Sequence, residues 1–211
     1  GVLELRTKSN TDLKAYFKYS TNPENWFYCR ECGKRASAPK FTTNSWMRTE
    51  AGKRTDVEFN KHYDLISNYT LNPKSRLFTI YDMSKRYLME DTSFVEVGCW
   101  RGGVTGLVAL SNKDKNIDYY ACDTFSGVVN ISDNDSFFKG NEYNDTSINT
   151  IKKLKDIVGE EINTVEGNFP NSMEDINFDK PISFAHIDVD TYISAKESLE
   201  YLSAHAIKGA L

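Results

Sequence analysis

The segment 94–103, FVEVGCWRGG, constrains the fold of this chain more than any other stretch of its sequence. Phe94, Val95 and Val97 are typical of a short buried strand, and the glycines behind them predict a turn. The next residues, 103–110 (GVTGLVAL), are expected to open a helix whose free N–H groups face that turn. A strand, a glycine turn and a helix in this order predict the ligand-binding start of a Rossmann-like domain.

The turn also limits which ligand such a domain can accept. We expect Gly98, Gly102 and Gly103 at places where a side chain would collide with a ligand or force an unfavourable backbone angle. A dinucleotide fingerprint needs a second glycine two residues after the first, but Trp100 occupies that position. The bulky indole argues against NAD or FAD. It favours a nucleoside ligand without a diphosphate, and S-adenosylmethionine (SAM) is the obvious candidate.

Acidic residues follow two further predicted strands. The segment 118–123 (DYYACD) ends in Asp123, about 25 residues after Gly98, where Rossmann-type sites hold the two ribose hydroxyls. The segment 182–192 (ISFAHIDVDTY) closes on Asp188 and Asp190, and strand alternation brings both carboxylates to the same side. Because ligands bind at the carboxyl ends of such strands, we expect both aspartates near the cofactor.

Helical patterns separate the predicted strands. Residues 74–90 carry apolar side chains at a spacing that buries one helix face, as do residues 145–158, which end before a plausible stop at Gly159. Residues 194–202 predict the next helix. Strands that alternate with helices predict an α/β fold, Rossmann-like, with a mostly parallel sheet and flanking helices.

Taken together, the motifs FVEVGCWRGG, CDTFSGV and HIDVDTY resemble the macrocin and mycinamicin (TylF-type) sugar O-methyltransferase family. The resemblance begins near residue 72, continues to residue 211 and includes the segment GNFP at 167–170. It implies a class I SAM-dependent O-methyltransferase that also needs a divalent metal, Mg²⁺ being the expected ion. The implied acceptor is a sugar or another polyhydroxylated small molecule.

The resemblance also assigns roles to residues of this chain. It implies that the cofactor is held by the turn after the first strand, by the end of the second strand, and by the loop that lies beside the adenine. In the same order, these residues are Glu96, Gly98, Trp100, Arg101, Gly102 and Gly103, then Asp123, Thr124 and Phe125, then Asn168 and Phe169. It implies that Asp188 is the catalytic residue and a metal ligand, with Asp190 as a second ligand.

Other interpretations of the acidic segment stay open at this stage. Either Asp188 or Asp190 could hold the metal while the other caps the following helix. His186 shares their face, but a lone strand histidine is more often a satisfied core residue than a base. The pair 188–190 also resembles the DxD motif of a nucleotide-sugar glycosyltransferase, and a non-catalytic Rossmann-like module is a third alternative.

The carboxyl terminus departs from the family pattern. The family has a second acidic pair after its next strand, whereas this chain ends at Leu211. Residues 206–211 resemble the approach to that strand, and the chain begins at Gly1 without an initiator methionine. We therefore expect a fragment of a longer protein, with a methyltransferase domain over 57–211 that lacks its last strands.

Residues 1–56 form a polar amino-terminal extension in which Cys29 and Cys32 make a CxxC turn before Gly33. Such a turn resembles one half of a zinc ribbon, but a closed Zn²⁺ site needs four ligands and no second CxxC occurs. His62 is the nearest spare donor. A zinc site is thus a weaker expectation than a plain turn, and a redox role is weaker still.

Composition narrows the classes of partner. The chain has 211 residues and a net charge of −4, which gives no basic field for nucleic acid. It has no apolar run long enough for a membrane span. Its four cysteines, two of them inside predicted strands, suit a reducing cytoplasm. The expected partner is the hydroxylated acceptor, and homo-oligomerisation is left open.

Overall fold

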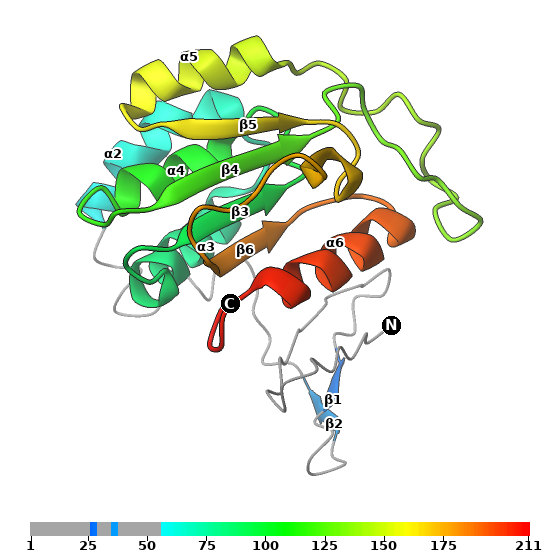
Figure 1. The fold of residues 1–211 in the computed structure, drawn as a ribbon, viewed down its shortest axis with the longest axis horizontal. Coiled ribbons are helices and arrows are strands. Elements are labelled where there is room, and N and C mark those ends of the chain that lie inside the picture. The colour runs from blue at the N-terminus through cyan, green and yellow to red at the C-terminus, as the bar shows by residue number, and fades with distance from the viewer. Residues whose placement is uncertain (1–25, 29–34, 38–55) are drawn as a thin grey trace. The chain divides into compact units, whose positions relative to one another are not determined.

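A parallel sheet positions the site (Figure 1). The computed structural model describes residues 56–211 and the backbone of residues 26–28 and 35–37. The sheet consists of β3 (Ser93–Val97), β4 (Asp118–Asp123), β5 (Ile162–Glu166) and β6 (Ile182–Ile187), in the order β5-β4-β3-β6. Each neighbouring pair is parallel, which confirms the predicted α/β fold with a parallel sheet. The carboxyl ends of the strands therefore meet at one edge.

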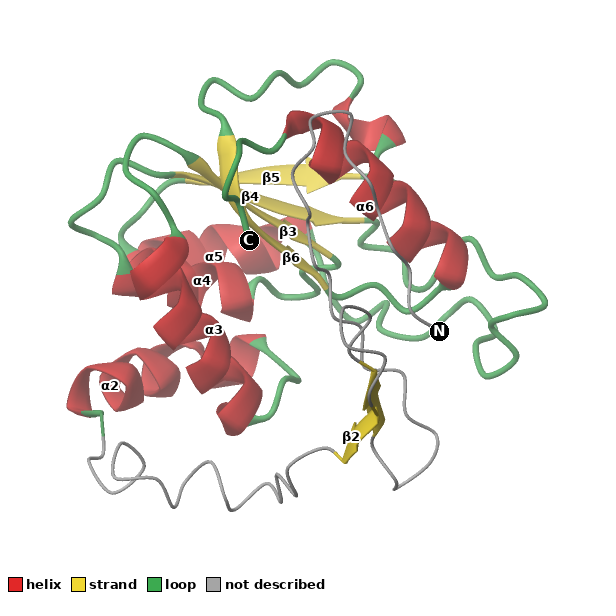
Figure 2. Cartoon of the chain, turned by 90° about the horizontal axis from the view of Figure 1, so that it is seen from below, coloured by secondary structure: helices red, strands yellow, loops and turns green. Residues whose placement is uncertain are grey.

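Helices cover both faces of this sheet. They are α2 (Val57–Ile66), α3 (Lys74–Tyr87), α4 (Gly103–Ser111), α5 (Ile148–Val158) and α6 (Tyr192–His205), with short 3-10 turns η2 (Ser67–Tyr69) and η3 (Asn171–Met173). Figure 2 shows α2 to α5 on one face and α6 on the other. Because more helices pack on one face of the sheet than on the other, that face carries the larger hydrophobic core.

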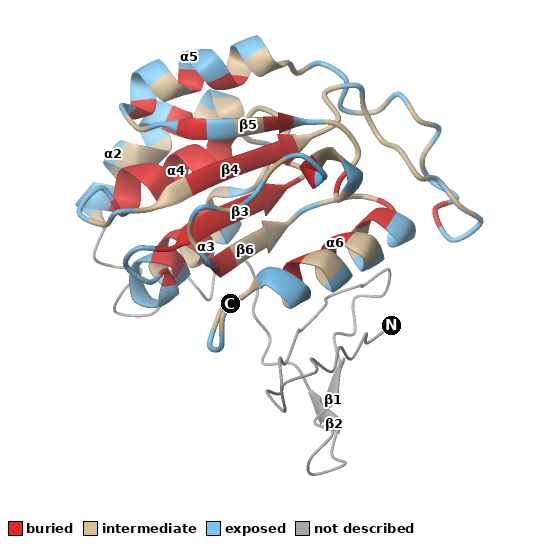
Figure 3. Ribbon diagram, in the orientation of Figure 1, coloured by how far each residue is buried: buried red, intermediate tan, exposed pale blue. Residues whose placement is uncertain are grey.

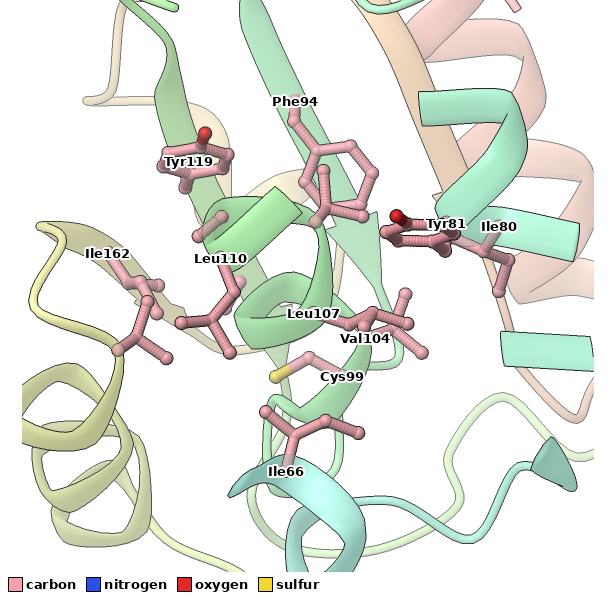
Figure 4. Close-up of a cluster of buried hydrophobic side chains, with 14 of the residues drawn as sticks. Ile66, Ile80, Tyr81, Phe94, Cys99, Val104, Leu107, Leu110, Tyr119 and Ile162 are labelled. Carbon is pink, nitrogen blue, oxygen red and sulfur yellow. The ribbon is translucent and has the colours of Figure 1, made fainter. Parts of the chain in front are cut away.

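Alternation along the strands divides the core into two clusters. Phe94 of β3 packs on the α4 side with Leu107 and Tyr119, and Figure 4 shows these side chains gathered around that helix. Val95 and Val97 point to the opposite face, towards Leu202 of α6. Because the period of a strand is two, Glu96 shares the face of Phe94 and lies beneath α4.

The helices follow the periodicity of the sequence closely. In α3 the buried positions are Leu77, Ile80, Tyr81 and Ser84, which follow the predicted helical spacing, whereas Tyr87, at the helix end, is 48% exposed. Helix α5 ends at Gly159, whose φ of +71° is the left-handed angle that a glycine stop supplies. Figure 3 shows the outer side of α5 exposed and the middle of the sheet buried.

Residues 206–211 lie beside β6. The backbone N–H of Ile207 donates to Ile182 at 3.0 Å, and the N–H of Leu211 donates to Ser183 at 2.9 Å. The N–H of Ala185 donates in turn to the carbonyl of Leu211 at 2.9 Å. The segment expected to approach a further strand therefore already hydrogen-bonds along the edge of β6.

The amino-terminal part of the chain is described only at two short strands. These are β1 (Trp26–Tyr28) and β2 (Arg35–Ser37), which pair antiparallel. Cys29 and Cys32, the expected half of a zinc site, lie outside the described residues. Internal contacts divide the chain into the units Gly1–Val57 and Glu58–Leu211. Among the described helices, none combines the length and apolar character that a membrane crossing requires.

Candidate functional site

A cavity of about 440 Å³ opens at the carboxyl ends of the parallel strands. This size is within the range of ligand pockets, roughly 300–1,000 Å³. Of the residues expected at a cofactor or metal site, the walls include Glu96, Gly98, Trp100, Asp123, Thr124, Asn168, Phe169, Asp188 and Asp190. Arg101, Gly102 and Phe125 lie in the adjoining turns and Gly103 begins α4, and none of them is among the wall residues. The structure thus brings most of the predicted residues to one cavity.

Glu96 is a buried carboxylate that anchors the start of α4. Its Oε2 accepts hydrogen bonds from the backbone N–H of Thr105 at 2.9 Å and from the Thr105 hydroxyl at 2.5 Å. Its Oε1 lies 3.4 Å from Nδ1 of His186, its register partner on β6. Burial alone would lower the pKa of His186, but the Glu96 carboxylate and, to a lesser degree, Asp188 raise it above the ordinary value. Glu96 therefore joins β3, α4 and β6 at the cavity wall.

Asp123 joins the two turns that lead away from β3 and β4. Its Oδ2 accepts from the backbone N–H of Trp100 at 2.8 Å, and its Oδ1 accepts from the N–H of Phe125 at 2.8 Å. Burial raises the pKa of Asp123, and these backbone hydrogen bonds oppose the rise. Each oxygen keeps further acceptor capacity, so the carboxylate can still bind hydroxyl groups of a ligand.

Trp100 and Arg101 are held by the loop that precedes α5. The indole Nε1 donates to Oδ1 of Asp145 at 2.8 Å, and Nη2 of Arg101 lies 2.8 Å from Oδ2 of the same carboxylate. The guanidinium carbon is 4.2 Å from the centre of the Trp100 ring. The hydroxyl of Thr146 donates to the carbonyl of Trp100. Arg101 is thereby directed to Asp145 and holds Trp100 in place.

The glycines of the turn are required for packing between protein segments. Gly98 has a φ of +84°, and a Cβ placed there would lie 2.4 Å from the carbonyl oxygen of Asp188. A Cβ on Gly103 would lie 2.6 Å from the carbonyl oxygen of Tyr69, and one on Gly102 would lie 2.7 Å from Ile151. The positive φ of Gly98, and that of Gly102 at +80°, bear out the expected need for an unusual backbone angle. Close approach of neighbouring backbone adds a second constraint at Gly98 and Gly103.

Asp188 receives its contacts from the segment in front of α3. The side-chain N–H of Asn72 donates to Oδ2 of Asp188 at 3.0 Å, and Nη1 of Arg76 lies 3.9 Å from Oδ1. Arg76 also donates to the side-chain oxygen of Asn72 at 2.7 Å. All three residues line the cavity. This contact could not be predicted from spacing, because Asn72 and Asp188 are far apart along the chain.

Asp190 lies deeper than Asp188 and in a more negative environment. Burial, followed by the charges of Asp188, Glu142 and Asp123, raises its pKa to about 6. The first turn of α6 is capped by neither predicted candidate but by Asp135, whose Oδ1 accepts from the N–H of Tyr192 at 2.9 Å. Both Asp188 and Asp190 are therefore available to the cavity.

Polar side chains line the wall beneath α6. The amide of Asn130 donates to the side chains of Asn168 at 3.1 Å and Ser194 at 3.2 Å. The hydroxyl of Ser198 is buried in the wall and has no hydrogen-bond partner among the described residues. Asn168, Ser194 and Ser198 line the cavity and offer donors and acceptors to a polar ligand, and Asn130 holds the first two of them. Ser194 and Ser198 were missed because their spacing in the sequence matches no known site motif.

The donor set for a metal is incomplete in the described part of the chain. No group of three or more His, Cys, Asp or Glu side chains that could hold a metal ion occurs there. Asp188 and Asp190 supply two carboxylates, and Asp188 already accepts a hydrogen bond from Asn72. The residues present therefore do not form a metal centre by themselves.

Comparison with known proteins identifies this architecture. The O-methyltransferase NovP superposes with a TM-score of 0.56 at 19% identity, covering 65% of this chain and 63% of NovP. The calicheamicin methyltransferase CalS11 superposes with a TM-score of 0.54 at 16% identity, covering 77% and 76%. These likenesses define the class, a methyltransferase-type α/β fold with a parallel sheet and flanking helices. The chain belongs to the macrocin O-methyltransferase (TylF) family, whose model matches residues 38–211.

Family membership confirms the predicted family and decides against the nucleotide-sugar glycosyltransferase interpretation of residues 188–190. The chain spans 63% of the length of NovP. Another structure of CalS11, described as a TDP-rhamnose 3′-O-methyltransferase, matches at 15% identity, with a TM-score of 0.46 and coverage of 77% and 76%. No curated protein matched the chain in a sequence search.

Proposed function

We propose that this chain carries the SAM-binding and reacting groups of an enzyme that methylates a hydroxyl of a sugar or another polyhydroxylated small molecule. The observation that carries the proposal is the Asp123 carboxylate. Two backbone N–H groups hold it in the wall of the cavity, and its remaining acceptor capacity suits two vicinal ribose hydroxyls. Family membership supports the same assignment.

The residues present fit the cofactor. Asp123 would bind the ribose, Trp100 and Gly98 would contact the amino-acid portion, and Asn168 with Phe169 would contact the adenine. The hydroxyl of Ser198, which has no hydrogen-bond partner in the described part of the chain, gives the wall a further donor and acceptor. When bound, SAM supplies an activated methyl group with its own leaving group. Glu96 would also lie beside the amino-acid portion, and its hydrogen bonds with Thr105 hold that part of the wall.

Asp188 is the group that would receive the proton of the acceptor hydroxyl. Its Oδ2 is held by Asn72, so the carboxylate has a defined orientation at the wall of the cavity. Its side chain is 40% exposed, which leaves Oδ1 accessible to an acceptor. A positioned carboxylate can accept a proton as the hydroxyl attacks, and orientation of the two reactants supplies much of the remaining acceleration.

A sugar acceptor is supported by the relatives. CalS11 is described as a TDP-rhamnose 3′-O-methyltransferase, and the family takes its name from a macrocin O-methyltransferase. The walls of the cavity carry carboxylate and amide groups, which suit an acceptor rich in hydroxyls. We extend this substrate class to the present chain as part of the proposal.

Metal dependence is a separate part of the proposal. Carboxylates are suitable ligands for Mg²⁺, and Asp188 and Asp190 would supply two of them. The described residues do not complete the site, so further ligands would have to come from elsewhere.

The test is a methyl-transfer assay with isotope-labelled SAM and a panel of TDP-sugars, free sugars and glycosides. Transfer to a hydroxylated member of the panel is expected, and Asp188→Asn should lower turnover by about 100-fold or more. Asp156→Asn, at an exposed position on α5, is the matched control and should leave turnover unchanged. Transfer to none of the panel, or full turnover in Asp188→Asn, would contradict the proposal. Repeating the assay in excess chelator tests the metal separately, since only loss of activity that Mg²⁺ restores supports it.

A further inference from the structure

A short relay of side chains runs from α3 to the carboxylate of Asp188. Nη1 of Arg76 donates to Oδ1 of Asn72 at 2.7 Å, and Nδ2 of Asn72 donates to Oδ2 of Asp188 at 3.0 Å. All three side chains line the cavity, although they come from segments that are far apart in the sequence. The relay therefore connects the start of α3 to the end of β6.

The chemistry of the three groups gives the relay a direction. A guanidinium has only donors, so Asn72 must present its amide oxygen to Arg76. The NH₂ group of the same amide then necessarily faces Asp188, whose ionised carboxylate has only acceptors. Without the Arg76 donor, the amide could rotate and place its oxygen against the carboxylate. Arg76 thus determines which end of the Asn72 amide meets Asp188.

The segment that carries Asn72 is itself fixed. The backbone N–H of Asn72 donates to the hydroxyl of Thr70 at 3.1 Å. Thr70 and Tyr69 pack so closely against Gly103, the first residue of α4, that a Cβ there would lie 2.7 Å from Cβ of Thr70. The packing of residues 69–70 against the start of α4 therefore positions both the turn after β3 and Asn72, which contacts Asp188.

Direct pairing of Arg76 with Asp188 contributes little by comparison. Their closest atoms are 3.9 Å apart, and the side chains are 58% and 40% exposed. Exposed ion pairs of this kind have small effects, because water and salt screen the charges. The hydrogen bonds of the relay are shorter and carry the directional information.

We propose that Asn72 and Arg76 are positioning residues that orient the Asp188 carboxylate towards the acceptor, with Arg76 acting through the Asn72 amide. The inference rests on the proposed function of Asp188. It assigns roles to Asn72, before α3, and to Arg76, in the first turn of α3, for which the sequence predicted no individual function.

The geometry can be tested without any acceptor, by NMR of the ¹⁵N-labelled chain. The side-chain amide signals of Asn72, assigned from their loss in Asn72→Ala, should shift in Arg76→Met and in Asp188→Asn. Arg76→Lys should perturb them less, because lysine also only donates. Arg86→Met on the same helix is the control, since Arg86 pairs with Asp82 at 2.8 Å. Asn72 side-chain amide signals that remain unshifted in both Arg76→Met and Asp188→Asn would contradict the relay.

Kinetics then tests the role of the relay. With an acceptor that the chain methylates, Arg76→Met should lower kcat by about 10-fold and leave the KM for SAM unchanged. Arg76→Lys should recover most of this loss. In an Asn72→Ala background, Arg76→Met should change kcat by less than about twofold, because its effect passes through the amide. Additive losses, or a raised KM for SAM with unchanged kcat, would refute the positioning role.

The two experiments also separate this inference from the proposed function. Absence of methyl transfer to every acceptor would remove the proposed function, and the NMR result would still decide the relay. If methyl transfer occurs but the Asn72 amide signals do not shift in the variants, the proposed function stands and the relay is contradicted.

Discussion

Backbone N–H groups hold the carboxylates at one end of the cavity, whereas side chains from a distant segment hold the carboxylate at the other. We call these the cofactor end (Glu96, Gly98, Trp100 and Asp123) and the acceptor end (Asn72, Arg76, Asp188 and Asp190). Asp123 accepts from the backbone N–H groups of Trp100 and Phe125, and Glu96 accepts from the backbone N–H and the hydroxyl of Thr105 in α4. Asp188 accepts from the Asn72 side chain and is 40% exposed. The cofactor end is thus built into the backbone, while the acceptor end can change with single side chains.

The two ends meet at Gly98, and a substitution there should have the largest effect. Gly98→Ala would place a Cβ 2.4 Å from the Asp188 carbonyl at a φ of +84°. Backbone atoms cannot yield as a flexible side chain can, so the free energy of unfolding should fall by about 3 kcal/mol or more. Urea denaturation of the chain measures it.

Gly159→Ala is the matched control for that substitution. Its φ is +71°, but the nearest atom to an added Cβ is the end of Lys113 at 3.6 Å. Gly159→Ala should lower the free energy of unfolding only by the strain of a left-handed alanine, about 1–2 kcal/mol. Equal losses in the two variants would show that crowding between the two ends is not what constrains Gly98.

Thr105→Val tests whether the cofactor end depends on the buried carboxylate. The variant removes the hydroxyl that donates to Oε2 of Glu96 at 2.5 Å, in a fully buried position. Loss of a hydrogen bond to a charged group should lower the free energy of unfolding by about 1.5–3 kcal/mol.

Thr79→Val provides the comparison, because that hydroxyl donates to the neutral carbonyl of Ser75 at 3.2 Å. Its cost should be about 0.5–1.5 kcal/mol. A larger loss in Thr79→Val than in Thr105→Val would contradict the role given to Glu96.

The acceptor end should gain stability when a carboxylate is removed. The pKa of Asp190 is raised to about 6, first by burial and then by Asp188. The folded chain therefore binds this proton more tightly than the unfolded chain, and stability falls as pH rises from the ordinary aspartate range through 6. Asp190→Asn should raise the free energy of unfolding by about 1 kcal/mol at pH 7.5 and by almost nothing below pH 4.

Thermal unfolding across this pH range measures that gain. For a chain of this size, 1 kcal/mol corresponds to a shift in Tm of about 2–4 °C. Asp156→Asn should show no comparable pH-dependent gain. An equal gain in the free energy of unfolding at pH 4 and pH 7.5 would show that the ionised Asp190 carboxylate does not destabilise the folded chain.

The same contrast explains what the sequence could predict. The strands β3, β4 and β6 were predictable because their apolar runs end in glycines or acids, and α5 because its apolar period ends at Gly159. Helix α2 was not predicted, because in its ten residues only Phe59 and Ile66 are buried, which gives a weak apolar pattern. The short edge strand β5 was implied only by the GNFP segment after it.

Prediction of the site was limited by contacts between distant segments. Asp123 could be predicted from spacing, because a strand end fixes where its side chain lies. The Asn72 contact with Asp188 could not, since it depends on how α3 packs against β6. The glycines and the unusual backbone angles of Gly98 and Gly102 could be predicted. The crowding of Gly98 and Gly103 could not, because the carbonyls of Asp188 and Tyr69 come from distant segments.

The most direct test of the division between the two ends is calorimetric titration of SAM into the wild-type chain, Asp123→Ala and Asp188→Asn. We expect the wild-type chain to bind SAM and Asp123→Ala to lose about 1–3 kcal/mol of binding free energy, the usual loss for a buried charged acceptor. Asp188→Asn should bind SAM within about twofold of the wild type, because its contacts lie at the acceptor end. Equal loss of affinity in both variants, or tighter binding of NAD than of SAM, would contradict the account.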